Sequence, residues 1–216
     1  MLQAEQLRAQ FRRIPKDCRE ANQGFSIRVW RATSWLQRAE SLDAIDVEGR
    51  FISCWIGFNA LYGRTDDRHR PWGDRESLGA FLAKVWNLDC TGDLRRILGK
   101  RQAVVLRLLD NKFLSSVYWE GSGAKAARQI NKEVKNAILT YMKPNRLRIL
   151  RLLFERLYVM RNQVFHGAST KGSYLNRRTL SASANILMDL LPACLAIMIE
   201  NGASEDWGGI CFPPQD

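Results

Sequence analysis

The apolar segment from Leu147 to Phe165 constrains the fold of this 216-residue chain more than any other segment does. Up to Met160, only three arginines and one glutamate interrupt it, so apolar side chains would cover most of the circumference of a helix. Pro144 is placed to open such a helix, and Gly167 is placed to follow its C-terminal end. The segment therefore predicts a central, largely buried helix.

Helical periodicity and capping residues recur along the rest of the chain, and strand signals are nearly absent. Further helices are predicted at residues 1–14, 26–42, 46–62, 74–88, 93–109, 124–142 and 178–200. We predict an all-α fold with a helical arm at residues 1–24, one domain of about six or seven helices at residues 25–200, and a loosely ordered tail at residues 201–216.

The composition is that of a soluble globular protein, with 46% hydrophobic and 25% charged residues. The formal net charge is +11 and the sequence pI is about 9.8. Such an excess of positive charge points to a polyanionic partner such as nucleic acid, although solvated arginine-rich helices are also common in proteins that bind none.

The five cysteines are scattered and form no Cys-x-x-Cys pair, which favours a reducing compartment and no zinc site. The first residues carry charges where a secretion signal needs an apolar core. The most apolar segment, residues 186–199, is short for a membrane span and contains Asp189 and Pro192. We expect a cytoplasmic protein with no membrane partner.

The candidate chemistry lies at Arg161, Asn162 and His166, at the end of the central helix. Residues five positions apart on a helix are separated by about 140° and about 7.5 Å in rise, so Arg161 and His166 meet only if the helix unwinds near Phe165 or the arginine reaches across. Arg161 and Asn162 could equally make ordinary capping contacts, with His166 as a cap residue.

The order Arg161, Asn162, three further residues and His166 resembles the motif of the HEPN superfamily (higher eukaryotes and prokaryotes nucleotide-binding). A second stretch, Phe58-Asn-Ala-Leu-Tyr-Gly63, resembles a segment of the Apea-like branch of that superfamily. The two stretches lie in the expected order, and the resemblance covers about residues 45–170. It implies a HEPN-like helical bundle and a metal-independent RNA endonuclease, with Arg161, Asn162 and His166 as catalytic residues and without a cofactor.

The chemistry of that class suits these side chains. The 2′-hydroxyl of RNA attacks the adjacent phosphorus, so one group takes a proton, another gives one to the 5′-oxygen, and a cation meets the added charge. Histidine suits the proton transfers because its ordinary pKa is about 6.5, and the planar guanidinium of arginine matches phosphate oxygens.

One motif histidine cannot fill two proton-transfer roles, and the resemblance implies a homodimer with a composite site at its interface. It also implies a toxin or antiviral-defence effector, with an antitoxin or defence-system partner. Some family members carry a modifiable tyrosine two residues after the histidine, where this chain has Ala168. The alternative is a non-catalytic helical module that binds RNA or a nucleotide, or an interaction protein in which His166 is only a cap.

Side chains that follow the motif could extend the RNA-binding surface. We predict RNA contacts at Lys171, Tyr174, Arg177 and Arg178, and backbone-phosphate contacts on the basic helices at residues 93–109 and 124–142. Those two helices also have the composition of ordinary peripheral helices.

Three further features allow both a functional and a structural interpretation. Trp30 and Trp35 could stack on bases, but tryptophans at helical spacing favour a core position. Asn59 could support the site, but a buried, hydrogen-bonded amide is the plainer prediction. The loop at residues 64–75, which contains His69 and three aspartates, matches no metal-ligand spacing, so we predict no metal there and either RNA contact or simple solvation.

Overall fold

The computed structural model describes residues 2–66, 68, 70–121, 123–143, 145–167 and 176–213. The chain divides into two compact units, whereas the sequence predicts a single domain. The first unit combines residues 1–94 with residues 187–216, and the second unit is the continuous stretch 95–186. The division falls inside two helices, α6 (Asp93–Lys100) and α11 (Arg177–Asn201), so no loop in the sequence marks it.

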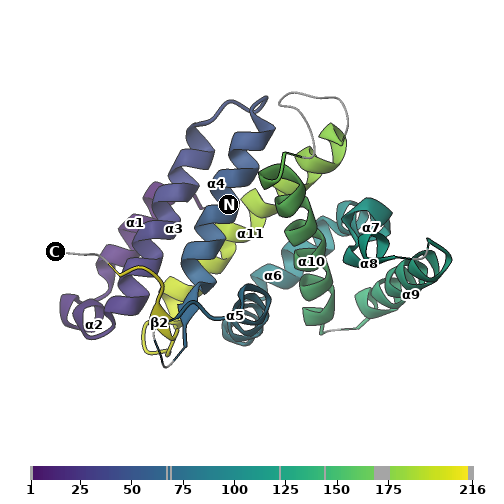
Figure 1. Ribbon diagram of the computed structural model, residues 1–216. Coiled ribbons are helices and arrows are strands. Elements are labelled where there is room, and N and C mark those ends of the chain that lie inside the picture. Colours follow the sequence, from purple (N-terminus) through teal and green to yellow (C-terminus); the bar gives the residue numbers. More distant parts are fainter. Residues whose placement is uncertain are drawn as a thin grey trace. The chain divides into compact units, whose positions relative to one another are not determined.

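The prediction of an all-α protein is confirmed, since the described residues are mostly helical (Figure 1). The helices are α1 (Ala4–Arg13), α2 (Lys16–Ala21), α3 (Gln23–Ser41), α4 (Val47–Tyr62), α5 (Asp74–Leu88), α6 (Asp93–Lys100), α7 (Gln102–Asp110), η1 (a 3₁₀ turn, Lys112–Leu114), α8 (Ser116–Glu120), α9 (Gly123–Tyr141), α10 (Leu147–Phe165) and α11 (Arg177–Asn201). Two short strands, β1 (Arg64–Thr65) and β2 (Gly209–Ile210), pair antiparallel.

In the first unit, α3 and α4 form the main helix pair and run side by side (Figure 1). The Asp46 carboxylate caps α4 by accepting the Gly49 N–H at 3.0 Å, and Gly63 ends the helix, both as the sequence predicts. Gly57 lets α4 approach α11 closely, because a Cβ at this position would lie 2.7 Å from a methyl carbon of Leu191.

The predicted arm at residues 1–24 contains α1 and α2. Helix α1 packs against α3 and buries Ala4, Leu7 and Phe11. Its basic end lies near Trp30, whose ring meets that of Phe11 edge-on at 6.1 Å. Trp30 is nevertheless 41% exposed and Trp35 36% exposed, so the expectation of a core position for both is wrong.

The chain after α11 makes more contacts than the predicted loosely ordered tail implies. Trp207 is buried, and its indole N–H donates to the Gly202 carbonyl at 2.9 Å. The guanidinium of Arg28, which is 1% exposed, donates to the carbonyls of Leu61, Gly63, Trp207, Gly208 and Gly209. One buried arginine thus joins the end of α4 to the segment that forms β2.

In the second unit, α7, α9 and α10 pack together. Arg156 of α10 is buried, pairs with Glu133 of α9 at 2.5 Å, and donates from Nε to the Leu109 carbonyl at 3.3 Å. A buried pair of this kind fixes which helices are neighbours, because either partner alone would be an uncompensated charge.

Helix α11 corrects one sequence-based statement. It is long and apolar enough to cross a membrane by length and composition, whereas the sequence suggested a segment too short to do so. Most of the qualifying window, 83%, is buried inside the protein, and buried core helices of soluble proteins pass the same test.

Candidate functional site

The three motif residues lie at the C-terminal end of α10, in the second unit. This helix buries apolar side chains from Ile149 to Met160, which holds that part of its backbone in place, and none of its last five residues is buried. It ends at Phe165, and His166 is the capping residue with φ −91° and ψ 10°. Gly167 follows with φ 68°, the left-handed conformation that terminates many helices. The predicted helix end is therefore confirmed.

Arg161 is half-buried, and its side chain lies along the helix. Its Nη1 donates to Oδ1 of Asn162 at 2.9 Å. The guanidinium carbon lies 4.8 Å from the ring centroid of Phe165 and 5.9 Å from that of Tyr158. Its Nε is buried and has no hydrogen-bond partner among the described residues. The buried Nε is out of reach of a ligand, but Nη2 is not among the buried atoms and makes no hydrogen bond among the described residues, so an oxyanion could use that nitrogen.

His166 differs from Arg161 in that its side chain is exposed. Its backbone N–H donates to the Asn162 carbonyl at 2.9 Å, so the cap position is fixed through the backbone while the imidazole faces solvent. No hydrogen bond joins Arg161 to His166 within the described part of the chain. Asn162 is the residue that contacts both, through its side chain to Arg161 and through its carbonyl to His166.

The four predicted RNA-contact residues divide into two pairs. Lys171 and Tyr174 lie outside the described residues. Arg177, half-buried, and Arg178, exposed, begin α11 in the second unit. The next residue, Thr179, accepts a hydrogen bond from the Asn111 side chain at 3.3 Å, which places the start of α11 beside η1.

A feature that the sequence analysis missed lies beside the motif. The Gln163 side chain donates to the Phe113 carbonyl at 2.7 Å, so η1 is attached to α10 next to Asn162. Phe113, Tyr118 and Trp119 form an aromatic cluster there, and Phe113 and Trp119 are exposed. The adjacent Tyr118 and Trp119, with Lys112 close before them, were the available signal in the sequence.

The basic charge is concentrated in the unit that contains the motif. Residues 95–186 contain 19 Lys and Arg and only 4 Asp and Glu, a formal charge of +15. The rest of the chain contains 14 Lys and Arg and 18 Asp and Glu, a formal charge of −4. The overall charge of +11 is therefore unevenly distributed between the two units.

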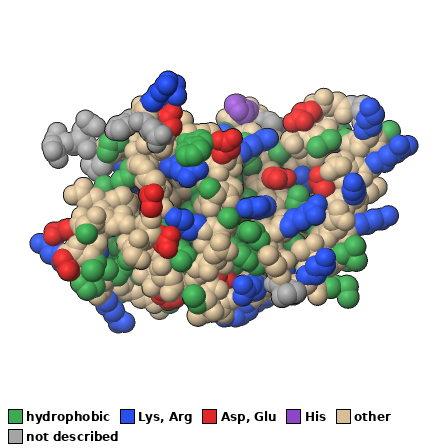
Figure 2. Space-filling view, turned by 90° about the horizontal axis from the view of Figure 1, so that it is seen from below, with side chains coloured by type: hydrophobic (Ala, Val, Ile, Leu, Met, Phe, Trp, Pro, Cys, Tyr) green, Lys and Arg blue, Asp and Glu red, His purple; other side chains and the backbone are tan. Residues whose placement is uncertain are grey.

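On the surface, the charges are dispersed. Lys and Arg side chains are spread over the face drawn in Figure 2, with Asp and Glu side chains between them. Exposed lysines on α9 include Lys125, Lys132 and Lys135. On this face, a polyanion would therefore meet scattered cations.

Asn59 does not lie in the same unit as the motif. It belongs to α4 in the first unit, is half-buried, and accepts a hydrogen bond from the Tyr62 hydroxyl. This contact within one helix turn agrees with the structural role that the sequence favours.

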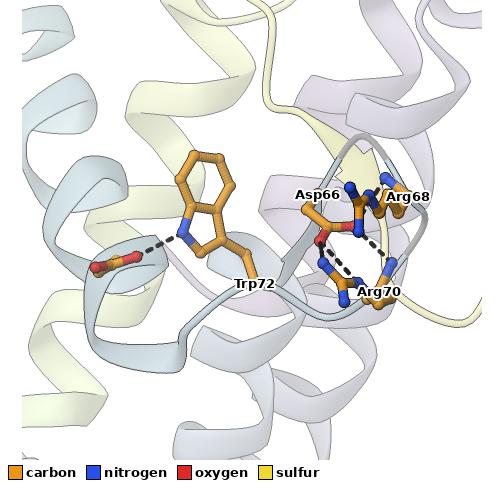
Figure 3. A network of polar contacts seen from close by, with 5 residues as sticks. Asp66, Arg68, Arg70 and Trp72 are labelled. Atoms are coloured by element: carbon orange, nitrogen blue, oxygen red, sulfur yellow. Dashed lines mark hydrogen bonds and ion pairs between the residues drawn. The ribbon is translucent and has the colours of Figure 1, made fainter.

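The loop at residues 64–75 is arranged around Asp66, while Asp67 and His69 lie outside the described residues. The Asp66 carboxylate accepts the backbone N–H groups of Arg68 and Arg70 and binds the Arg70 guanidinium at 3.0 and 2.9 Å (Figure 3). These hydrogen bonds, above all the one from the Arg70 backbone N–H, lower the pKa of the Asp66 carboxyl below its ordinary value. The described residues contain no group of three or more possible metal ligands.

The neighbouring Trp72 is held from two sides. Its indole N–H donates to Glu76 at 2.5 Å, and the Arg64 guanidinium lies 3.7 Å from its ring centroid (Figure 3 shows the first contact). These contacts fix the position of the Trp72 side chain.

Comparison with known proteins gave no match: no family model, no curated protein and no solved structure is similar to this chain.

Proposed function

We propose that the second unit carries the catalytic site of a HEPN-like, metal-independent RNA endonuclease. One observation carries the proposal: Arg161, Asn162 and the exposed His166 lie at one helix end within a unit of formal charge +15. The exposed imidazole can transfer protons, and the guanidinium at the same helix end can stabilise the charge that develops on a phosphodiester.

The reaction forms the bond from the ribose 2′-oxygen to phosphorus and breaks the bond from phosphorus to the 5′-oxygen. An imidazole takes the proton of the 2′-hydroxyl, and an imidazolium gives a proton to the departing 5′-oxygen. Arg161 stabilises the negative charge that builds up on the phosphoryl oxygens. Asn162, already bonded to Arg161, orients the guanidinium.

Two imidazoles are needed, and each chain supplies one at this site. A homodimer with two-fold symmetry brings a second His166 to the same phosphate and gives the base and the acid from equivalent residues. The protein would then act as a toxin or antiviral-defence effector in the cytoplasm, restrained by a partner. Growth arrest on induced expression of the wild type, absent with His166→Ala, tests that role.

The second candidate is an RNA-binding module that does not cleave. The charge of the second unit favours it, because phosphate binding needs no particular histidine. The lack of a hydrogen bond between Arg161 and His166 in the described chain also fits a site used only for binding.

The first prediction separates the two candidates. Purified wild type should cleave single-stranded RNA in EDTA, and His166→Ala should reduce the rate by about 10²- to 10⁴-fold while RNA affinity stays within about twofold. His69→Ala, which removes the only other histidine of the sequence, is the matched control and should cleave at the wild-type rate. Circular dichroism checks that each variant is folded.

Two outcomes would contradict the enzyme. If wild type and His166→Ala bind RNA equally and neither cleaves it, the binding module is the better description. If EDTA abolishes cleavage and Mg²⁺ restores it, a metal takes part, and the proposed proton transfers are wrong.

A further inference from the structure

An exposed aromatic cluster lies beside the proposed catalytic site, and we define it as Phe113, Tyr118 and Trp119. The ring of Tyr118 meets those of Phe113 and Trp119 edge-on, each at 5.2 Å, and the centroids of Phe113 and Trp119 are 6.5 Å apart. Phe113 is 41% exposed and Trp119 is 61% exposed. Neighbouring large aromatic side chains that are exposed to solvent are typical of a surface that binds a ligand or a partner.

The cluster is held in place by hydrogen bonds to its backbone. The carbonyl of Phe113 accepts the Trp119 indole N–H at 3.0 Å and the Gln163 amide at 2.7 Å. The backbone N–H of Phe113 donates to Asn111 at 3.0 Å. These bonds order the aromatic side chains before a ligand binds, so binding would cost little conformational entropy.

The same bonds connect the cluster to the motif and to a predicted RNA-contact pair. Gln163 follows Asn162 and precedes His166 on α10. Asn111 also donates to Thr179, directly after Arg177 and Arg178. Asn111 and Thr179, which are 68 positions apart, therefore meet beside η1 within the second unit.

Cationic groups accompany the aromatic rings. The Lys112 ammonium lies 5.1 Å from the ring centroid of Phe113 and 5.7 Å from that of Tyr118. Together with the charge of +15 on the unit, this favours an anionic aromatic ligand over an apolar protein surface. An unpaired nucleotide has both properties, a flat base that stacks and a phosphate that meets lysine.

We infer that the aromatic cluster is a base-stacking subsite for single-stranded RNA, in which Trp119 stacks on an unpaired base and Lys112 meets a neighbouring phosphate. This inference rests on the proposed function, because it takes RNA as the substrate and places one base of it beside the cleaved bond. A duplex cannot offer an unstacked base, so the subsite selects single-stranded segments.

The test measures the binding of a fluorescein-labelled, single-stranded RNA of mixed sequence in EDTA, with all variants in a His166→Ala background so that no RNA is cleaved. Trp119→Ala should weaken binding by roughly 5- to 150-fold, since stacking on one aromatic residue is worth about 1–3 kcal/mol per base. Trp119→Phe loses the indole hydrogen bond but keeps a ring, and should stay within about threefold. Binding of a blunt RNA duplex of equal length should change little.

Trp35→Ala is the matched control, because Trp35 is also exposed, at 36%, but lies on α3 in the first unit. It should bind both RNAs as the parent does. Equal affinities for Trp119→Ala and Trp35→Ala would overturn the inference. Loss of self-association in Trp119→Ala with RNA affinity unchanged would overturn it too, and would identify the cluster as a contact between copies of this chain.

The inference and the proposed function can fail separately. If Trp119→Ala weakens single-strand binding but wild type cleaves no RNA, the subsite stands and the endonuclease does not. If wild type cleaves RNA in EDTA and Trp119→Ala leaves affinity unchanged, the endonuclease stands and the subsite does not.

Discussion

Two arginines, Arg28 and Arg161, show how surroundings decide what a guanidinium does in this protein. Arg28 is buried and donates to five carbonyls, so its donors are used in holding the first unit together. Burial lowers its pKa to about 10, which still leaves it charged at neutral pH. Arg161 is half-buried and makes one side-chain hydrogen bond among the described residues, to Asn162. Arg28 is therefore structural, whereas the proposed function assigns Arg161 a chemical role.

The role of Arg28 gives a prediction at this scale. Arg28→Met should lower the free energy of unfolding by about 3 kcal/mol, because it leaves buried carbonyls without a donor at about 1–3 kcal/mol each, partly offset by water. It should also make residues 202–213 sensitive to protease, since their link to α4 is lost. Urea denaturation and limited proteolysis measure the two effects.

The control is Arg31→Met on the same helix. Arg31 donates to the carbonyls of Cys211 and Phe212 at 3.0 and 2.6 Å, nearer to solvent, so its loss should cost less than about 1 kcal/mol. Equal losses in the two variants would contradict the structural role given to Arg28.

At the scale of elements, the sequence predicted those helices whose signals are local. The Asp46 cap, the end of α4 at Gly63 and the span of α5 from Asp74 to Leu88 are confirmed. The predicted helix at 93–109 is instead two helices, α6 and α7, with Arg101 between them. Elements α2, η1 and α8 were missed because helices this short carry too few periods to recognise and depend on tertiary contacts.

Dependence on tertiary contacts also limits how much of the candidate site can be predicted from the sequence. The motif triplet lies in one short stretch of sequence at a helix end, so it could be singled out by its resemblance to a family motif, whereas its spacing alone was weak evidence. The aromatic cluster depends on the Gln163 to Phe113 bond across fifty positions, and the Arg28 contacts span 33 to 181 positions. No periodicity within one segment encodes such contacts.

Replacing a helical glycine by alanine should have opposite effects on stability in α4 and in α5. Gly57→Ala should cost about 1–3 kcal/mol, because the new methyl group would lie 2.7 Å from buried Leu191. Gly79→Ala on α5 should stabilise by about 0.5–1 kcal/mol, because nothing lies within 4 Å of its new Cβ and alanine favours helices. Urea denaturation of both variants measures the signs, and a stable Gly57→Ala would refute the close approach.

At the scale of the whole molecule, the uneven charge predicts where RNA binds. Replacing Lys125, Lys132 and Lys135 of α9 by glutamine should reduce the slope of log affinity against log salt by up to about 2, because each lost phosphate contact on a single strand removes about 0.7. Fluorescence anisotropy at several salt concentrations gives the slope.

The matched control removes the same charge from the first unit. Glutamine at Arg13, Lys16 and Arg38, all exposed, should leave the slope unchanged. An equal fall in both triple variants would mean that RNA responds only to net charge and not to the second unit.

The first unit is assembled from both ends of the chain, and this has a consequence for synthesis on the ribosome. Residues 95–186 are synthesised before residues 187–213. The second unit is therefore complete before Leu191, which packs against Gly57 of α4, has been made. At about 5–20 residues per second, the interval between synthesis of Tyr62, which ends α4, and synthesis of Leu191 is on the order of ten seconds. During that time the face of α4 that packs against Met188 and Leu191 is uncovered, so the segment that was made first is the one most exposed to aggregation.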